Sequence, residues 1–134
     1  MSEIVFIGTG GSMATKDRDN TSFLIRSSKG LLLIDCPGSI IQKLKKCSVD
    51  PKKLDGILLT HTHPDHIYGL PSLVHSLMLE DCRIPVYGSR ESVDFGAALL
   101  DLFGLREKKF RCRLDFVAVE EGESVGLSST VSCS

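Results

Sequence analysis

The stretch "GILLTHTHPDHIYGL", Gly56 to Leu70, constrains the fold of this chain more than any other segment. Its short apolar run is typical of a buried strand, and it passes directly into three histidines and one aspartate within six residues. The apolar spacing that follows predicts a helix over Pro71–Leu79. The polar cluster is therefore expected in the loop after a buried strand, at the edge where helix-covered sheets commonly bind ligands.

Strands and helices alternate along the rest of the chain. Besides those above, the sequence predicts strands over Glu3–Ile7, Thr21–Arg26, Leu31–Asp35, 83–88 and 114–119, and the start of a further strand over 124–127. It predicts helices over 39–46 and 91–104, with Gly104 as the C-terminal stop of the second. This order predicts the α/β (α+β) class, with a mixed sheet covered by helices. At 134 residues the chain has the length of one domain.

The residue types and spacing of the cluster indicate a metal site. Imidazole and carboxylate groups are ligands of Zn²⁺, Mn²⁺ and Fe²⁺. His61 and His63 alternate along an extended segment and can point at one ion, while Asp65 and His66 follow the bend at Pro64 and can point at a second. Two ions so placed would activate a water between them. The alternative, a polar loop that binds no metal, suits a lone histidine better than this pattern.

With its flanks, "HTHPDH" resembles the HxHxDH signature of the metallo-β-lactamase superfamily, whose order of elements recurs here from the Gly-rich turn through "LLIDCPG" to "IPVYG". The resemblance implies a single domain over residues 1–134, one half of an αββα sandwich that lacks its C-terminal half. It implies that His61 and His63 bind one divalent ion and that Asp65 and His66 bind the other. Zinc is the first expectation, with manganese or iron as alternatives. Asp65 would also be catalytic, accepting a hydrogen bond from the bridging water.

Two further segments, "FIGTGGSMATKDRDNTSFLI" and "HIYGLPSLV", are similar to the ribonuclease Z branch of that superfamily and its phosphodiesterase relatives. This similarity implies hydrolysis of phosphodiester bonds, in a small substrate or at the 3′ end of an RNA. Two other interpretations stay open. The chain could hydrolyse a thioester, lactone or other carboxyl ester, or it could be a catalytically incomplete binding or structural protein.

The resemblance also implies ligands that the cluster does not contain: a third histidine, a bridging aspartate and a last histidine, all downstream. The one histidine left in the chain, His75, points away from the apolar stripe of its helix, which predicts a solvated side chain. We therefore expect the remaining ligands from a C-terminal half or from a second chain in a homodimer. A half-sandwich without either would expose a large apolar sheet face.

Two sets of residues outside the cluster are candidates for supporting roles. Asp35 ends a strand and could position a ligand histidine, as metal ligands generally require, or could simply stabilise a turn. Lys108, Lys109 and Arg111 lie in the basic segment "REKKFRCR" and could contact substrate phosphates, with a solvated loop as the alternative. The lysines at 43, 45 and 46 are expected to form a solvated helix face.

Composition narrows the class of protein. A formal net charge of −1 gives no overall attraction to nucleic acid or membrane, and no apolar run has the length of a membrane span. The first residues lack the basic and apolar regions of a signal peptide. The five cysteines are scattered and odd in number, without a CxxC pair, which argues against a disulfide scaffold. We therefore expect reduced thiols, a cytoplasmic protein and no membrane partner.

Overall fold

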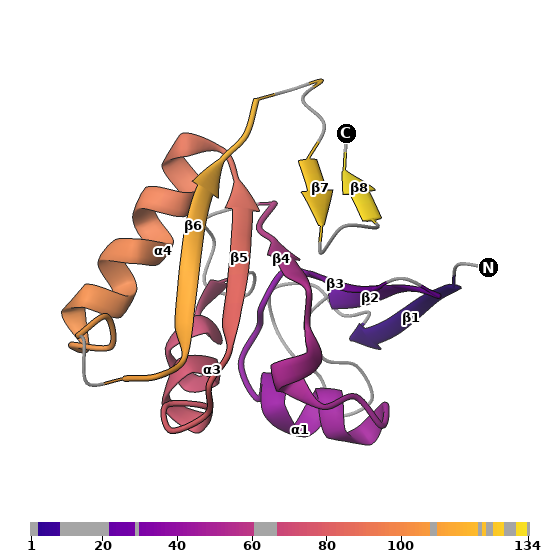
Figure 1. Ribbon diagram of the computed structural model, residues 1–134, viewed down its shortest axis with the longest axis horizontal. Helices are drawn as coiled ribbons and strands as arrows, with labels where there is room; N and C mark the ends of the chain where they lie inside the picture. Colours follow the sequence, from indigo (N-terminus) through magenta and orange to yellow (C-terminus); the bar gives the residue numbers. More distant parts are fainter. Residues whose placement is uncertain are drawn as a thin grey trace.

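The described part of the chain is built around one mixed β-sheet, in a computed structural model that describes residues 3–8, 22–28, 30–60, 67–107, 110–120, 122, 125–127 and 131–133. The strands of this sheet are β1 (Glu3–Gly8), β2 (Ser22–Ser27), β3 (Gly30–Ile34), β4 (Gly56–Leu58), β5 (Arg83–Gly88) and β6 (Arg113–Ala118). They lie side by side in sequence order (Figure 1). The first three pair antiparallel, and β3 to β6 pair parallel.

Helices connect the parallel strands, as such connections require. They are α1 (Ile40–Lys46), the 3₁₀ turn η1 (Pro51–Lys53), α3 (Leu70–Ser76) and α4 (Arg90–Leu102). Among the described residues, none of these helices is both long and apolar enough to cross a membrane. The predicted fold class, a mixed sheet covered by helices, is confirmed.

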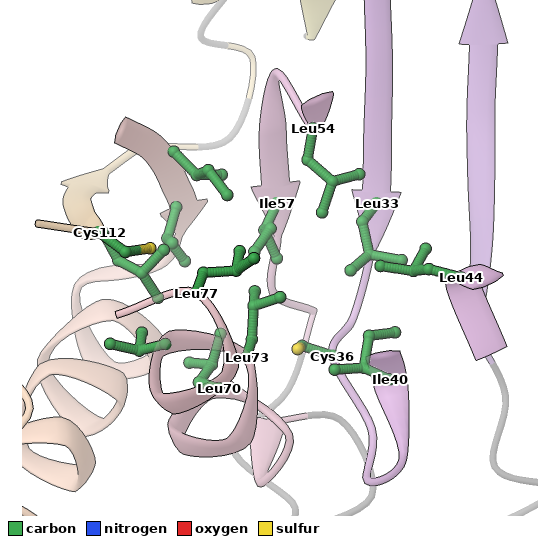
Figure 2. Close-up of a cluster of buried hydrophobic side chains, with 14 of the residues drawn as sticks. Leu33, Cys36, Ile40, Leu44, Leu54, Ile57, Leu70, Leu73, Leu77 and Cys112 are labelled. Carbon is green, nitrogen blue, oxygen red and sulfur yellow. The ribbon is translucent and has the colours of Figure 1, made fainter. Parts of the chain in front are cut away.

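The main hydrophobic core lies between the helices and one face of the sheet. Side chains alternate along a strand, so Leu33 and Ile57 point to this face while their neighbours point away. Leu73 and Leu77 come from α3, on the apolar stripe that the sequence predicts, and Figure 2 shows them beside Ile57. The 3.6-residue period of the helix thus meets the 2-residue period of the strands in one buried layer.

The other face of the sheet is also apolar, and its centre is buried. Leu32, Ile34 and Tyr87 form a second cluster and are only 2%, 6% and 6% exposed. Val117 on the edge strand β6 is 38% exposed. The prediction that this face is broadly exposed is therefore wrong for the centre of the sheet and holds toward its two edge strands, since Ile4 on β1 is 59% exposed.

The C-terminal segment differs from its predicted form. The sequence predicts the start of a single further strand in this segment. The structure instead has two short strands, β7 (Val125–Leu127) and β8 (Val131–Cys133), paired antiparallel in a sheet of their own. Figure 1 shows β7 and β8 side by side, and they do not join the six-stranded sheet.

Two helices end earlier than predicted. The helix expected to reach Leu79 ends at Ser76, where the Leu77 amide donates to the carbonyls of Leu73 and Val74. The helix expected to reach Gly104 ends at Leu102. Gly104 has φ 67° and its amide donates to the Asp101 carbonyl, so it terminates the helix as a glycine in the left-handed region commonly does.

Lys43 corrects the prediction of a fully solvated lysine face on α1. Lys45 and Lys46 are exposed, but Lys43 is 7% exposed and its Nζ donates to the Gly38 carbonyl in the loop before the helix. Helical side chains lean toward the helix N-terminus, so the long stem of Lys43 can follow the buried surface back to that carbonyl.

The start of α3 packs tightly on the loop that follows β3. The Gly69 amide donates to the Cys36 carbonyl over 2.8 Å. A Cβ atom placed on Gly69 would lie 2.0 Å from the Pro37 carbonyl oxygen. Only glycine therefore allows the two segments to approach this closely.

The core predicts a large difference between two leucine substitutions. Leu73 is fully buried, whereas Leu102 is 79% exposed. We expect Leu73→Ala to lower the free energy of unfolding by about 2–5 kcal/mol, because it removes buried methyl groups and leaves a cavity. Leu102→Ala is the matched control and should change it by less than about 0.5 kcal/mol. Urea unfolding followed by circular dichroism measures both, and equal effects would contradict this account of the core.

The contact at Gly69 gives a second test. Gly69 has φ −78° and ψ −11°, which alanine adopts readily, so we expect most of the cost of Gly69→Ala to come from the clash with the Cys36 and Pro37 carbonyls. We expect a loss of about 1–3 kcal/mol in the free energy of unfolding. Ser72→Ala, at an exposed position of the same helix, is the control and should be near neutral. An alanine at position 69 that left stability unchanged would show that the loop and helix are not tightly packed.

Candidate functional site

The C-terminal ends of β3 and β4 lie at the same end of the sheet, hereafter its carboxyl edge, because the two strands are parallel neighbours. Ile34 pairs with Leu58 at the last position of this register. Asp35 continues the pairing, since its amide donates to the Leu58 carbonyl over 2.8 Å. The Leu59 amide donates in turn to the Tyr87 carbonyl of β5, also over 2.8 Å. Thr60 follows at this edge, immediately before the predicted metal-binding residues.

The predicted ligands themselves, His61, His63, Asp65 and His66, lie outside the described residues. The structure does describe the residues on both sides of them. The geometry of the site is therefore built from its flanks, Thr60 on one side and Ile67 to Gly69 on the other.

Asp35 holds the first flank with both oxygens of its carboxylate. Its Oδ1 accepts the Thr60 amide over 2.8 Å and its Oδ2 accepts the Thr60 hydroxyl over 2.7 Å. Asp35 is 4% exposed and has φ 62°, a left-handed conformation that aspartate tolerates better than most residues. The Ser22 hydroxyl donates to its carbonyl over 3.1 Å. These contacts fix Thr60, from which the histidine segment continues.

The second flank packs on the same turn. The Gly69 amide donates to the Cys36 carbonyl, and the Tyr68 ring lies so close to Gly38 that a Cβ there would meet its hydroxyl oxygen at 2.7 Å. Ile67 is 1% exposed and belongs to the main core. The turn formed by residues 35–38, hereafter the anchoring turn, therefore contacts the chain on both sides of residues 61–66.

A neutral thiol lies within the anchoring turn. Cys36 is fully buried, and Figure 2 shows its sulfur among the core side chains near Ile40. Burial raises the pKa of this thiol well above its ordinary value, the negative charge of Asp35 raises it further, and Lys43 opposes them. Cys36 is therefore held as a thiol and is unsuited to act as a nucleophile or metal ligand.

Arg111, the one predicted phosphate-binding residue that the structure describes, does not lie at this edge. Arg111 directly precedes Cys112 and the start of β6, and its Nε donates to an oxygen of Asp81 over 2.9 Å, with a second bond from Nη2 to the other oxygen. These bonds raise the pKa of Arg111. Because β4, β5 and β6 are parallel, the amino ends of β5 and β6 lie at the opposite edge from Asp35 and Thr60. Lys108 and Lys109 lie outside the described residues.

The remaining histidine is placed as predicted. His75 is exposed on the last turn of α3. Within the part of the chain that the structure describes, no group of three His, Cys, Asp or Glu side chains could hold a metal ion. A metal site with three such ligands in this chain would therefore need at least one residue outside the described part.

Sequence reasoning missed the part played by Thr60, Tyr68 and Gly69. A signal for Thr60 was present: Asp35 and Thr60 both follow predicted strands, and a hydroxyl opposite a carboxylate at neighbouring strand ends favours a hydrogen bond. No local pattern announces the contacts of Tyr68 and Gly69, because they depend on how α3 packs on the anchoring turn.

Comparison of the sequence with known proteins finds a matching family model and several relatives. Residues 2–91 match the family model described as anti-Pycsar protein Apyc1. The ribonuclease Z of Thermococcus kodakarensis is 33% identical over 103 residues, which cover 75% of this chain and 33% of that relative. The chain thus spans about a third of the length of this curated relative.

Solved structures show the same fold. The short form of human tRNase Z superposes with a TM-score of 0.73 at 24% identity, over 88% of this chain and 45% of that one. The metallo-β-lactamase fold protein YhfI of Bacillus subtilis superposes with a TM-score of 0.72 at 22% identity, over 92% of this chain and 47% of that one. The family model covers most of the chain, which therefore belongs to the family described as anti-Pycsar protein Apyc1.

Proposed function

We propose that the protein is a metal-dependent hydrolase of phosphodiester bonds, with His61, His63, Asp65 and His66 as its metal ligands. The observation that carries this proposal is the double attachment of the anchoring turn. Asp35 fixes Thr60 before the ligand segment, and Cys36 and Gly38 contact Gly69 and Tyr68 after it. Such preorganisation is what a metal site needs and a merely solvated loop does not.

The length of the segment supports this proposal. Each residue from His61 to His66 is at most three peptide units from Thr60 or Ile67, which are both described. Three units span no more than about 11 Å. The four proposed ligands would then lie near the C-terminal ends of β3 and β4.

The donor set fits a divalent transition metal. Three imidazoles and one carboxylate suit zinc first, with manganese or iron as alternatives, and His61 and His63 would hold one ion while Asp65 and His66 hold the second. When bound, such ions supply Lewis acidity to the phosphoryl group and acidify a water molecule. The carboxylate of Asp65 would accept a hydrogen bond from that water and orient it. Asp35, through Thr60, would hold the backbone from which His61 projects.

The names of two relatives favour a phosphodiester substrate over a carboxyl ester. One is named a ribonuclease Z and another a tRNase Z, so an RNA or a smaller phosphodiester is the proposed substrate. The basic residues Lys108, Lys109 and Arg111 remain a proposed phosphate contact. In the structure Arg111 is paired with Asp81 at the N-terminal ends of β5 and β6. It would therefore contact a part of the substrate that lies away from the proposed metal ligands.

The proposed ions need ligands beyond the four in this segment. His75 is exposed at the end of α3 and is not part of the edge. We propose that a C-terminal half or a second copy of the chain in a homodimer supplies them. Without that supply the chain would be a binding or structural protein, which is the alternative that the following experiment must exclude.

Metal content and hydrolysis test the proposal together. We expect elemental analysis of the purified chain to find bound zinc, manganese or iron, and we expect hydrolysis of bis-p-nitrophenyl phosphate. Asp65→Ala should lower the rate by more than about 100-fold, since losing a partner of a metal ligand already costs up to that much. Asp94→Ala, at an exposed position of α4, is the control and should retain activity.

The outcomes separate the alternatives. A folded preparation that binds no added zinc would overturn the proposal in favour of a binding or structural protein. Hydrolysis of p-nitrophenyl acetate without hydrolysis of the phosphodiester would favour a carboxyl-ester substrate.

The contact between Asp35 and Thr60 gives a separate prediction. Thr60→Val removes the hydroxyl that donates to Asp35 but keeps the hydrogen bond from the backbone amide. Thr60→Ser keeps both hydrogen bonds. We expect Thr60→Val to weaken zinc binding by roughly 10-fold and Thr60→Ser to leave it unchanged. Competition with a chromophoric chelator measures the dissociation constants without an activity assay. Equal affinities for the two variants would show that the hydroxyl does not position the ligand segment.

A further inference from the structure

Two cysteines lie side by side at the edge of the sheet opposite the candidate metal centre. Cys82 directly precedes β5 and Cys112 directly precedes β6, and the first residues of these strands, Arg83 and Arg113, are partners in the parallel register. The Arg113 amide donates to the Cys82 carbonyl over 3.0 Å, which extends the pairing to the cysteines. Both are free thiols.

The side chains of the two cysteines point to the same face of the sheet. Cys112 is a member of the main core and Cys82 packs against it, on the helix side. Figure 2 shows the Cys112 sulfur at the margin of this core, near Leu77. Neighbouring strands lie about 4.8 Å apart. This spacing is within the range that a disulfide requires between Cα atoms.

The residues on either side keep the cysteines in register. The Arg111 guanidinium pairs with the Asp81 carboxylate through two bonds, just before the two cysteines. The Arg111 amide also donates to the Met78 carbonyl over 2.9 Å. A bond between the sulfurs would therefore need little movement of the backbone.

Only one of the two thiols is open to a reagent. Cys112 is 1% exposed, whereas Cys82 is half-buried and lines a pocket of about 300 Å³. The other lining residues are Asp81, Arg83, Arg111 and Arg113, which are three cationic residues and one acidic residue. The excess of positive charge attracts an anionic reagent to Cys82.

We infer that Cys82 and Cys112 form a reversible disulfide by exchange with an anionic low-molecular-weight disulfide, of which oxidised glutathione is the probe. Cys82 loses its proton and its sulfur attacks one glutathione sulfur, so the glutathione disulfide breaks and the first glutathione leaves. Cys112 then loses its proton and attacks the Cys82 sulfur, and the second glutathione leaves. Two protein thiols are oxidised, one glutathione disulfide is reduced to two glutathione thiols, and the two protons pass to them.

The order of attack follows from the surroundings of Cys112. Burial raises the pKa of its thiol to about 12, and the hydrogen bond and charge of Cys82 add to the effect. Cys112 is therefore a poor first nucleophile. Once Cys82 carries glutathione, its contribution to that raised pKa disappears and the second step becomes easier.

The bond would join the amino ends of β5 and β6 and close the loop that contains α4. It would constrain the unfolded chain and thereby raise the temperature of unfolding. The candidate metal centre is at the carboxyl edge of the sheet, so the bond should leave its metal content unchanged. The inferred disulfide is thus a redox-dependent stabilisation, independent of the proposed hydrolysis.

Oxidation of the purified chain in glutathione buffers tests this inference. We expect the wild type to lose two free thiols and to yield a Cys82–Cys112 peptide link by mass spectrometry after quenching with N-ethylmaleimide. The melting temperature should rise and should return after dithiothreitol. Cys82→Ser and Cys112→Ala should form no link, with alanine used at the buried position so that the variant keeps an apolar side chain. Cys47→Ser, which removes another half-buried thiol, is the matched control and should behave as wild type.

Three results would overturn the inference. Glutathione that stays attached to Cys82 in the wild type would show that Cys112 does not attack. Unchanged thiol content in strongly oxidising buffer would show that Cys82 does not react. An equal loss of two free thiols in Cys82→Ser would show that the disulfide forms between other cysteines.

Discussion

The hydrogen bonds from Thr60 to the Asp35 carboxylate are the interaction on which the candidate site depends. They join residues 25 positions apart in the sequence and tie together the carboxyl ends of two parallel strands. Burying a carboxylate costs free energy unless its oxygens are hydrogen-bonded, and here Thr60 donates to both oxygens of Asp35. The same two hydrogen bonds therefore stabilise the Asp35 carboxylate and hold Thr60 in place.

The two edges of the sheet have different chemistry. At the carboxyl edge, backbone and side-chain bonds hold the flanks of a segment rich in imidazole. At the amino edge of β5 and β6, an ion pair and a backbone bond hold two thiols in register. Thiolates and imidazoles both bind zinc, so their separation keeps the cysteines from competing for the metal of the proposed site.

Features that depend on one short stretch could be predicted from the sequence. The strand over 83–88 has the predicted bounds, and the apolar stripe of α3 is buried as its spacing indicates. The 3₁₀ turn η1 was missed although Asp50 before Pro51 is a recognisable start signal. Lys43 could not be predicted to be buried, because its partner is a carbonyl of the preceding loop and not a residue of its own helix. The pairing of Asp35 with Thr60 required the order of the strands, which the sequence alone does not determine.

The same bonds also bear on whether the fold needs the metal. In small metal-stabilised domains the ligands have no partners until the ion binds, so metal binding and folding are one event. In the described part of this chain, no buried side-chain nitrogen or oxygen lacks a hydrogen-bond partner. Asp35 is satisfied by Thr60, and the anchoring turn packs on α3 through protein atoms alone. The described residues on both sides of positions 61–66 are therefore joined to the anchoring turn by hydrogen bonds and packing of their own.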